Sequence, residues 1–526
     1  MYGIKPVLSF VYNSKIDLTV HILAPFLLLH SQQSPHAATK TRTFELNLAP
    51  EVPAPPLVFE RKRARPPSTM DEKITSFQTA HPDITVLTSS SPDYAARRKR
   101  HDLLNPANDD VTPPGIVIPK DAAEVAAFVG WAAASTPPVK FTLRSGGANF
   151  WGHNFAADAL VLDLRELAAV RVAPDRKTAT VGGGIITEAL MRALAAEGLL
   201  TPTGNWWHVG YAGWATLGGY GPLQGAYGMG FEQIVGAQVV DAGGRLAAAS
   251  DEVLEGVRGM GGNLGVVTEL TIKVYPAHDL LSGMIIYNSG ADGLGPTLRR
   301  VQTGLASLAH PRAATTHTFV QYLPPLGARV IAVLLTWGSA DHAAGRAFVQ
   351  AVVEATGGDV ATTTVAAVSP VAQQEAMPHV KVPAGGQRSA YVHRATAAVV
   401  AVAAAGAASI PDEPSPNLSM SGLVALDPAP APANTFAPAG PHVLVTFSDF
   451  CGDAARRDEV KAWTDGVEAQ IRACPDVLPG SYPGLTAPGA RSGPDLFGLK
   501  WARVKELKKK YDPRGVFDLA VPRVDL

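Results

Sequence analysis

Three glycine clusters in this sequence could hold a phosphate group. They read RSGGAN at 144–149, TLGGYGP at 216–222 and GMGGNLGVVT at 259–268. Glycine permits positive φ and lets the backbone approach a ligand closely, and successive N–H groups in such turns form an anion-binding nest. No cluster has the Rossmann pattern with its acidic residue, and none is a Walker A loop. One such cluster is usually a turn, but three together favour a cradle for a long diphosphate ligand.

Other catalytic patterns do not stand out. There is no persuasive Ser-His-Asp order or Cys-His pairing, and the 14 histidines are scattered without metal-ligand spacing, so we expect no metal site. Two cysteines, Cys451 and Cys474, cannot build a disulfide framework. The 45 basic and 46 acidic residues nearly cancel, which argues against a nucleic-acid or anionic-membrane partner. We expect a small-molecule ligand, and the oligomeric state stays open.

The clusters fall among alternating strand-like and helix-like segments. Asp121 and Glu124 have the spacing of a capping box, and Gly198 suits a helix end after the start at Thr187. Farther on, β-branched and aromatic runs predict strands, and the Ala-rich run at 395–410 predicts a packed helix that does not span a membrane. The expected strands lie at 115–120, 139–143, 159–164, 178–184, 265–276, 283–288, 316–323, 329–337 and 442–450, with a hairpin at 234–250.

The first 69 residues differ in composition. The apolar run LTVHILAPFLLL at 18–29 is too short to cross a bilayer and fits either a secretory signal or a disordered extension. Residues 50–68 are Pro-rich and basic, as in a linker, and periodic structure begins near Met70. We favour a cytoplasmic location over secretion.

The order of the motifs resembles that in the FAD-linked oxidases of the vanillyl-alcohol oxidase superfamily. Within this superfamily it is similar to the fungal type of the berberine-bridge-enzyme-like group. The resemblance covers residues 80–280 and the C-terminal end, and rests on RSGG, ATVGGG, GNWWHVGYAGWATLGGYGPLQGAYGMGFEQIVGAQVVDAGGRL, RGMGGNLGVVTELTIKVYP and VKELKKKYDPRGVF. It implies an α+β fold. A PCMH-type FAD-binding domain of two α/β subdomains would occupy 70–280. A substrate domain with an antiparallel sheet covered by helices would occupy 281–480, and residues 481–526 would return to the FAD domain.

The resemblance also assigns cofactor contacts. The loop under the pyrophosphate would be formed by Arg144, Ser145, Gly146 and Gly147, followed by Ala148, and the next loop by Gly204, Val209 and Gly210. The ribityl and diphosphate groups would face Thr216, Leu217, Gly218, Gly219, Tyr220 and Gly221. Gly265 and Val267 would reach the adenine side. Lys500 would either lie near the flavin's pyrimidine oxygens or be a surface helix residue with its stem on apolar neighbours.

Two departures from the family concern covalent attachment. Many members have a flavin-bonded His at the position of Ala148, and some add a Cys at the position of Trp206. Neither residue here is a nucleophile, so the resemblance implies noncovalent FAD unless His153 or His208 takes the role.

The expected reaction follows from the cofactor. A small organic substrate, of the secondary-metabolite kind, would lose a hydride to flavin N5 while a base takes a proton, and oxygen would reoxidise the flavin. Candidate bases in the substrate domain are Tyr391, Tyr322 and His393, with His317 and Phe447 as further pocket candidates. The alternatives are a non-redox cyclase on the same scaffold and a binding protein that keeps the fold without a cofactor.

Overall fold

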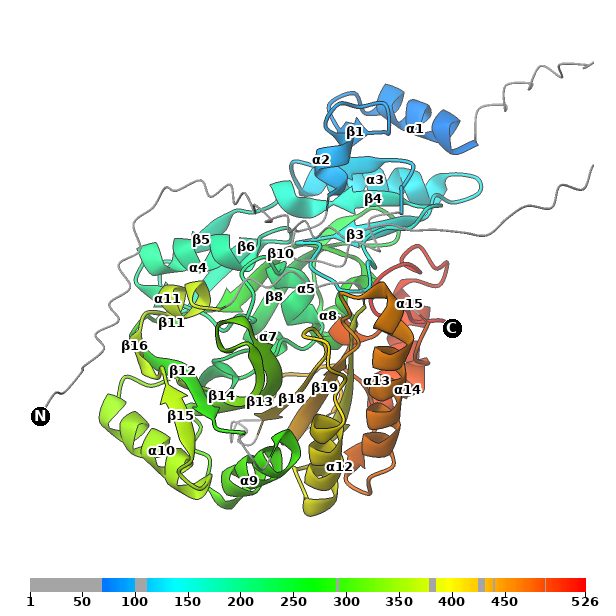
Figure 1. The fold of residues 1–526 in the computed structure, drawn as a ribbon. Coiled ribbons are helices and arrows are strands. Elements are labelled where there is room, and N and C mark those ends of the chain that lie inside the picture. Colours follow the sequence, from blue (N-terminus) through cyan, green and yellow to red (C-terminus); the bar gives the residue numbers. More distant parts are fainter. Residues whose placement is uncertain are drawn as a thin grey trace, which may run out of the picture. The chain divides into compact units, whose positions relative to one another are not determined.

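The computed structural model describes residues 69–99, 111–289, 293–377, 385–423, 431–438, 440–487 and 489–526. The extension predicted at 1–69 therefore lies outside the described residues, apart from Thr69, where helix α1 (Thr69–Ala80) begins. Helices and strands alternate along the chain, and the strands form three main sheets (Figure 1). The mixed helix and sheet content agrees with the predicted α+β class.

The first sheet has the strand order β1-β2-β4-β3, with β4 parallel to both of its neighbours. Helix α3 (Ala122–Ala134) begins where the Asp121 side chain accepts the N–H groups of Ala123 and Glu124, which confirms the predicted N-cap. Phe128 of this helix packs edge-to-face on Phe141, with ring centroids 5.3 Å apart. The other elements are α2 (Tyr94–Arg98), β1 (Thr85–Leu87), β2 (Ile116–Ile118), β3 (Phe141–Arg144) and β4 (Leu160–Asp163).

The second sheet is antiparallel, in the order β5-β6-β10-β8-β9. The predicted hairpin at 234–250 is confirmed as β8 (Ile234–Val240) and β9 (Leu246–Ala248). The remaining elements are β5 (Val170–Val172), β6 (Thr178–Gly182), β10 (Val266–Lys273), the pair β7 (Leu199–Leu200) and β11 (Tyr275–Pro276), and helices α4 (Thr187–Ala196), α5 (Tyr211–Thr216), α6 (Gln224–Tyr227), α7 (Gly230–Gln233) and α8 (Asp251–Met260).

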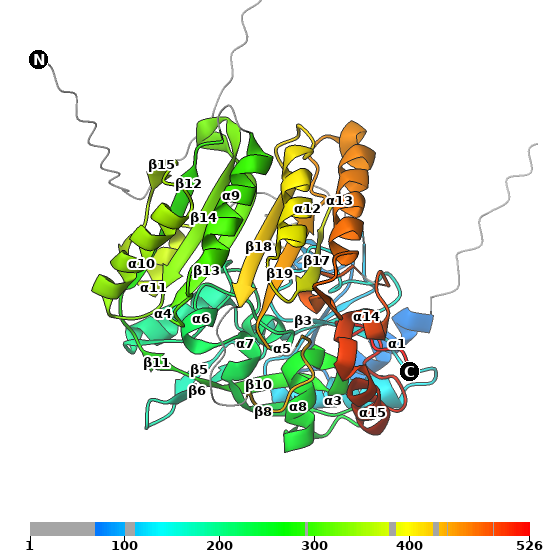
Figure 2. The same ribbon diagram turned by 90° about the horizontal axis from the view of Figure 1, so that it is seen from below.

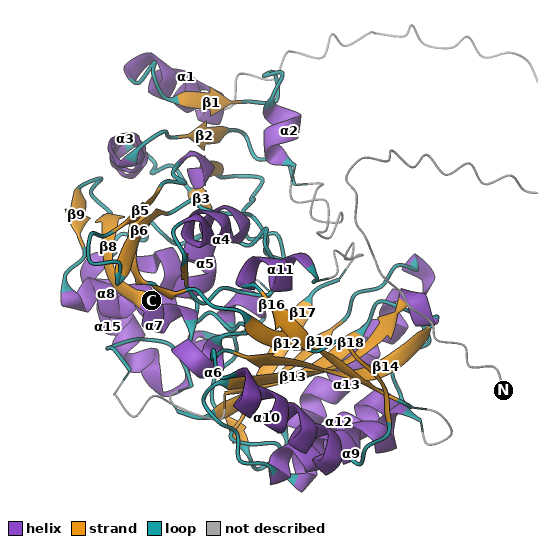
Figure 3. Ribbon diagram, turned by 90° about the vertical axis from the view of Figure 1, so that its left-hand side faces the viewer, coloured by secondary structure: helices purple, strands orange, loops and turns teal. Residues whose placement is uncertain are grey.

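The third sheet is antiparallel, with nine strands in the order β15-β12-β14-β13-β18-β19-β17-β20 and β16 beside β12. Four helices cover one of its faces, α9 (Leu294–Ser307), α10 (His342–Ala355), α12 (Ala397–Ala408) and α13 (Arg457–Arg472) (Figures 2 and 3). The strands are β12 (Leu280–Tyr287), β13 (Ala314–Leu323), β14 (Ala328–Trp337), β15 (Val360–Thr363), β16 (Ala366–Val368), β17 (Gln387–Val392), β18 (Asn417–Leu423), β19 (His442–Ser448) and β20 (Val477–Leu478).

Side-chain alternation on this sheet separates a core face from a site face. On β19, Val445 and Phe447 are fully buried in the core between the sheet and its helices. Successive side chains of a strand point to opposite faces, so Leu444 and Thr446 point away from the helices. The site face of the sheet is turned toward the loops of the first two sheets.

The C-terminal segment packs on α8 and its neighbours. Val504 and Leu507 of α15 (Trp501–Tyr511) share a small core with Met260 and Leu264, and the Arg503 guanidinium bonds Glu255 at 2.7 Å. The two remaining α-helices of the described residues are the short α11 (Pro370–Glu375) and α14 (Gly493–Phe497). Within the described residues, no helix is long and apolar enough to cross a membrane.

Candidate active site

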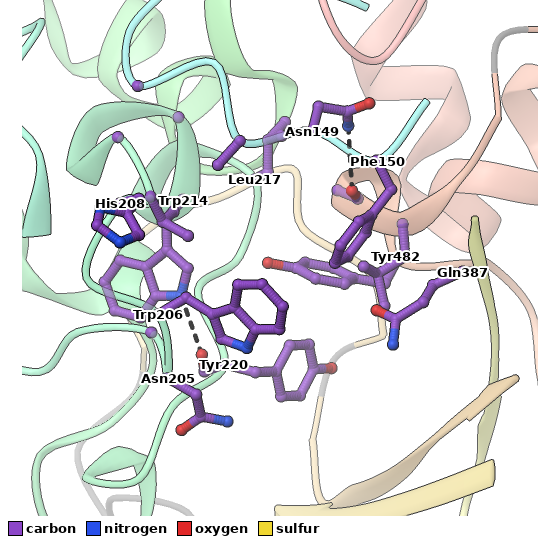
Figure 4. A pocket seen from close by; sticks show the side chains of 18 of the residues that line it. Asn149, Phe150, Asn205, Trp206, His208, Trp214, Leu217, Tyr220, Gln387 and Tyr482 are labelled. Carbon is purple, nitrogen blue, oxygen red and sulfur yellow. Dashed lines mark hydrogen bonds between the residues drawn. The ribbon is translucent and has the colours of Figure 1, made fainter. Parts of the chain in front are cut away.

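A cavity of about 630 Å³ lies between the site face of the third sheet and the loops that follow β3 and precede α5. Figure 4 shows the residues at its centre, with Trp206, Tyr220 and Tyr482 grouped together and Phe150 and Asn149 beside them. One end is made of glycine loops, and the other is made of strand side chains. The predicted cofactor residues that line the cavity are Ser145, Gly146, Gly147, Ala148, Gly204, Val209, Gly210, Thr216, Leu217, Tyr220 and Val267.

Two of the glycine loops touch each other through their backbones. A Cβ on Gly210 would lie 2.2 Å from the Gly146 nitrogen, and a Cβ on Gly146 would lie 2.3 Å from the Gly210 nitrogen. Gly147 has φ of +81°, which also favours glycine. The Ser145 hydroxyl donates to the Gly183 carbonyl at 2.8 Å and holds the first loop in place. The loops therefore keep this geometry only without side chains at these positions.

This loop fits a diphosphate. The N–H groups of Gly146, Gly147 and Ala148 find no acceptor in the described part of the chain, and all three residues line the cavity. Successive N–H groups without partners suit a buried anion, which needs main-chain donors more than it needs a cationic side chain. The donor set is thus compatible with the pyrophosphate of FAD.

Several predicted cofactor residues do not line the cavity and make structural contacts instead. The Arg144 guanidinium is buried and donates to the carbonyls of Arg97 and Lys99, at 2.7 and 2.9 Å. Lys500 is half-buried at the start of α15 and donates to the Asn434 carbonyl at 3.0 Å. Four glycines are required by close packing of the chain on itself, because a Cβ would meet Phe436 at Gly218, Gly230 at Gly219, the Thr203 carbonyl at Gly221 and Val239 at Gly265.

The two tether positions both face the cavity. Ala148 and Trp206 are among its lining residues, and the Trp206 ring packs edge-to-face on Phe150 with centroids 5.9 Å apart. His153 and His208 line it as well, and His153 Nε2 lies 2.9 Å from the Thr486 carbonyl. Ala148 and the Trp206 indole therefore stand at the two positions where the family resemblance implies a nucleophile.

The candidate bases are placed unevenly. Tyr322 lines the cavity, as does His317. Tyr391 is fully buried, does not line the cavity, and packs its ring against His442 with centroids 5.4 Å apart. His393 is exposed outside the cavity, and Phe447 belongs to the core on the helix side of the sheet. The predicted strands included Tyr322, His317 and Phe447 without assigning the face to which each side chain points, and they did not include Tyr391 or His393.

Tyr220 and His442 form a pair that the sequence motifs did not predict. The Tyr220 hydroxyl meets His442 Nε2, and His442 Nδ1 lies 2.8 Å from the Gly440 carbonyl. Burial lowers the pKa of His442 to about 4 and raises the pKa of Tyr220 well above its ordinary value. Alternation along HVLVTF could have revealed His442, because it shares a face with Leu444 and Thr446, which line the cavity.

Comparisons with known proteins agree with this site. Residues 113–250 match the FAD binding domain family. The chain is 28% identical to the FAD-linked oxidoreductase aurO of Gibberella zeae over 471 residues, 86% of this chain and 88% of that one. Its fold matches 6-hydroxy-D-nicotine oxidase from Arthrobacter nicotinovorans with a TM-score of 0.69 at 22% identity, covering 83% and 96% of the two chains. It also matches the BBE-like 1 protein of Physcomitrella patens with a TM-score of 0.71 at 17% identity, covering 86% and 98%.

Fold and site thus define an FAD-linked oxidoreductase, an enzyme built on the PCMH-type FAD-binding fold. The similarity to FAD-linked oxidoreductases and to the fold of the BBE-like 1 protein agrees with the resemblance to the vanillyl-alcohol oxidase superfamily that the sequence motifs carry. In the described residues, no group of three or more His, Cys, Asp or Glu side chains could hold a metal ion.

Proposed function

We propose that this enzyme oxidises a small organic substrate with noncovalently held FAD, using Tyr220 as the base. One observation carries the proposal: Tyr220, whose hydroxyl meets His442, lines the same cavity as the glycine loop with its unpartnered N–H groups. FAD would supply the hydride acceptor, which oxygen then reoxidises. The reactive end of the cofactor would share its surroundings with Ala148, Trp206 and Tyr482.

Noncovalent attachment follows from the side chains available. Ala148 has no nucleophile, and the Trp206 indole cannot bond a flavin carbon as a thiolate would. Binding would then depend on the backbone loop Ser145–Ala148, on the Gly210 loop, and on stacking by the surrounding aromatic rings.

Tyr220 is better placed as the base than the tyrosines expected from the sequence. A carbonyl can only accept, so the contact with Gly440 puts the His442 proton on Nδ1 and leaves Nε2 bare. Nε2 therefore accepts the Tyr220 O–H, which leaves an oxygen lone pair for a substrate hydroxyl. His442 orients Tyr220 and can take its proton as the tyrosine takes the proton of the substrate.

Acid precipitation of the purified protein tests the cofactor arrangement. We expect yellow protein whose flavin appears in the acid supernatant, because neither tether position can bond it. Flavin that remains in the pellet would show that another residue forms the bond. Colourless protein that does not respond to added FAD would refute the oxidase proposal.

A second experiment tests the reaction itself. Anaerobic mixing of the loaded enzyme with an active substrate should bleach the flavin absorbance near 450 nm, and admission of air should restore it with release of hydrogen peroxide. Tyr220→Phe should slow the bleaching by about 10²–10⁴-fold, the usual contribution of a general base. An isomeric product formed without bleaching would favour the non-redox cyclase.

A further inference from the structure

We propose that the substrate of this enzyme is an uncharged aromatic molecule that carries hydroxyl groups. This inference rests on the proposed function, because it names what the substrate end of the same cavity would bind. It is drawn from three features of the wall: its lack of charge, its aromatic side chains and its row of neutral polar groups.

The described part of the wall has no carboxylate, ammonium or guanidinium group. Among the described residues that line the cavity, there is no Asp, Glu, Lys or Arg. His317 lies on the sheet wall with Nε2 3.0 Å from the Ser419 hydroxyl, and burial lowers its pKa to about 3, so it is neutral at pH 7. A charged substrate would lose its hydration here without gaining an opposite charge, which is strongly unfavourable.

Aromatic rings surround the junction of the two ends of the cavity. Tyr220 and Tyr482 pack edge-to-face with centroids 5.0 Å apart, and Phe150 packs on Phe450 at 5.2 Å. Trp206 lies against the same space in Figure 4. Such walls bind a flat ring through offset and edge contacts. A sugar carries more hydroxyl groups than the few polar side chains of this wall can pair, so some of them would be buried against these rings without partners.

Neutral polar groups follow one line on the sheet. Ser419 and Thr446, on adjacent strands, face the cavity with their hydroxyl oxygens 2.6 Å apart. The side-chain amides of Asn417 and Gln387 also line it and make no hydrogen bond within the described part of the chain. These amides can donate to and accept from a hydroxyl group on the ligand, and they would orient a ring that the aromatic side chains hold.

The test uses four probes of matched size on the FAD-loaded enzyme at pH 7.5: 2-naphthol, 2-naphthoate, 2-naphthylmethylammonium and cellobiose. Isothermal titration measures each dissociation constant without requiring turnover. We expect 2-naphthol to bind at least tenfold more tightly than each of the other three. Equal or tighter binding of either charged naphthalene, or of cellobiose, would overturn the proposal.

Two nearly isosteric variants then place the effect on the wall. Gln387→Glu and Asn417→Asp each add one carboxylate, so each should tighten 2-naphthylmethylammonium at least tenfold and weaken 2-naphthoate. Gln470→Glu, on the exposed surface of α13, adds the same charge away from the cavity and should change neither constant. Failure of both folded wall variants to alter the ranking would refute the assigned site.

These outcomes are distinct from failure of the proposed function. Flavin content and bleaching report on the oxidase reaction, whereas the titrations report only on which ligands the wall accepts. A protein that bleaches with substrate yet binds charged and neutral naphthalenes equally would keep the function and lose the substrate class.

Discussion

The contact between Gly146 and Gly210 predicts a large effect from one methyl group. In Gly210→Ala, the new Cβ would lie 2.2 Å from the Gly146 nitrogen and 2.4 Å from the Ser145 hydroxyl oxygen, whereas ordinary contacts begin at 3.4 Å. The backbone φ at Gly210 is −66°, so the strain is steric and not conformational. Because a backbone atom cannot rotate away, the two loops must move apart by more than 1 Å.

Overpacking of this kind costs about 1–3 kcal/mol. If FAD requires the two loops in their present positions, the whole cost appears in cofactor affinity, which corresponds to a dissociation constant raised about 5- to 150-fold. Equilibrium dialysis of the apoprotein against FAD measures this constant, and urea unfolding measures the remaining stability.

Gly466→Ala is the matched control. Gly466 lies inside α13, and a Cβ there would meet nothing within 4 Å. This variant should keep the FAD affinity and should gain about 0.5–1 kcal/mol of stability from its better helix propensity. If Gly210→Ala binds FAD as the wild type does and unfolds at the same urea concentration, the argument from loop contact is wrong.

Three further predictions follow from buried groups and from the cofactor wall. Burial lowers the pKa of His442 to about 4. Below about pH 6.5 the unfolded chain therefore takes up a proton on this residue that the folded chain excludes. Urea unfolding should show that the free energy of unfolding falls by about 2 kcal/mol between about pH 7.5 and pH 5, and this fall should be missing in His442→Gln. Ala148→His should make the denatured protein band fluorescent under ultraviolet light, and a folded, FAD-loaded variant that stays dark would show that residue 148 does not adjoin the reactive flavin carbon. Asp512→Asn leaves the buried Lys508 ammonium, now 2.7 Å from the carboxylate, without its counter-charge, and should lower the free energy of unfolding by about 3–5 kcal/mol; an unchanged urea midpoint would contradict this.

Local patterns were enough for much of the fold. Asp121 and Glu124 marked a helix start because a carboxylate cap acts within a few residues. The Gly-Gly turn near 243 marked the β8–β9 hairpin because a tight turn also depends on only a few adjacent residues. The glycine loop at 144–147 could be assigned to a ligand site because its residue pattern and the resemblance agreed, whereas the loop at 204–210 was assigned by the resemblance alone. Residues of both loops line the cavity.

Residues on strands were harder to place, because a strand gives a side chain two possible faces and the sequence does not say which one meets the ligand. Tyr391, a predicted base, is buried and does not line the cavity. His442 lies on the neighbouring strand, where it meets the hydroxyl of Tyr220, a residue of a loop distant in the sequence. Gly218, Gly219 and Gly221 have the motif of a ligand cradle, and an added Cβ at each would meet protein atoms.

The sequence by itself determined the local elements, the glycine loops and the absence of a nucleophile at residues 148 and 206, since each depends on residue type and near neighbours. Only the tertiary structure decided the composition of the site. It brought Tyr220 to His442, which is 222 positions away, and it directed Arg144 and Lys500 to protein carbonyls. The physical reason is that burial and pairing depend on which surfaces pack together, and residues far apart in the chain supply those surfaces.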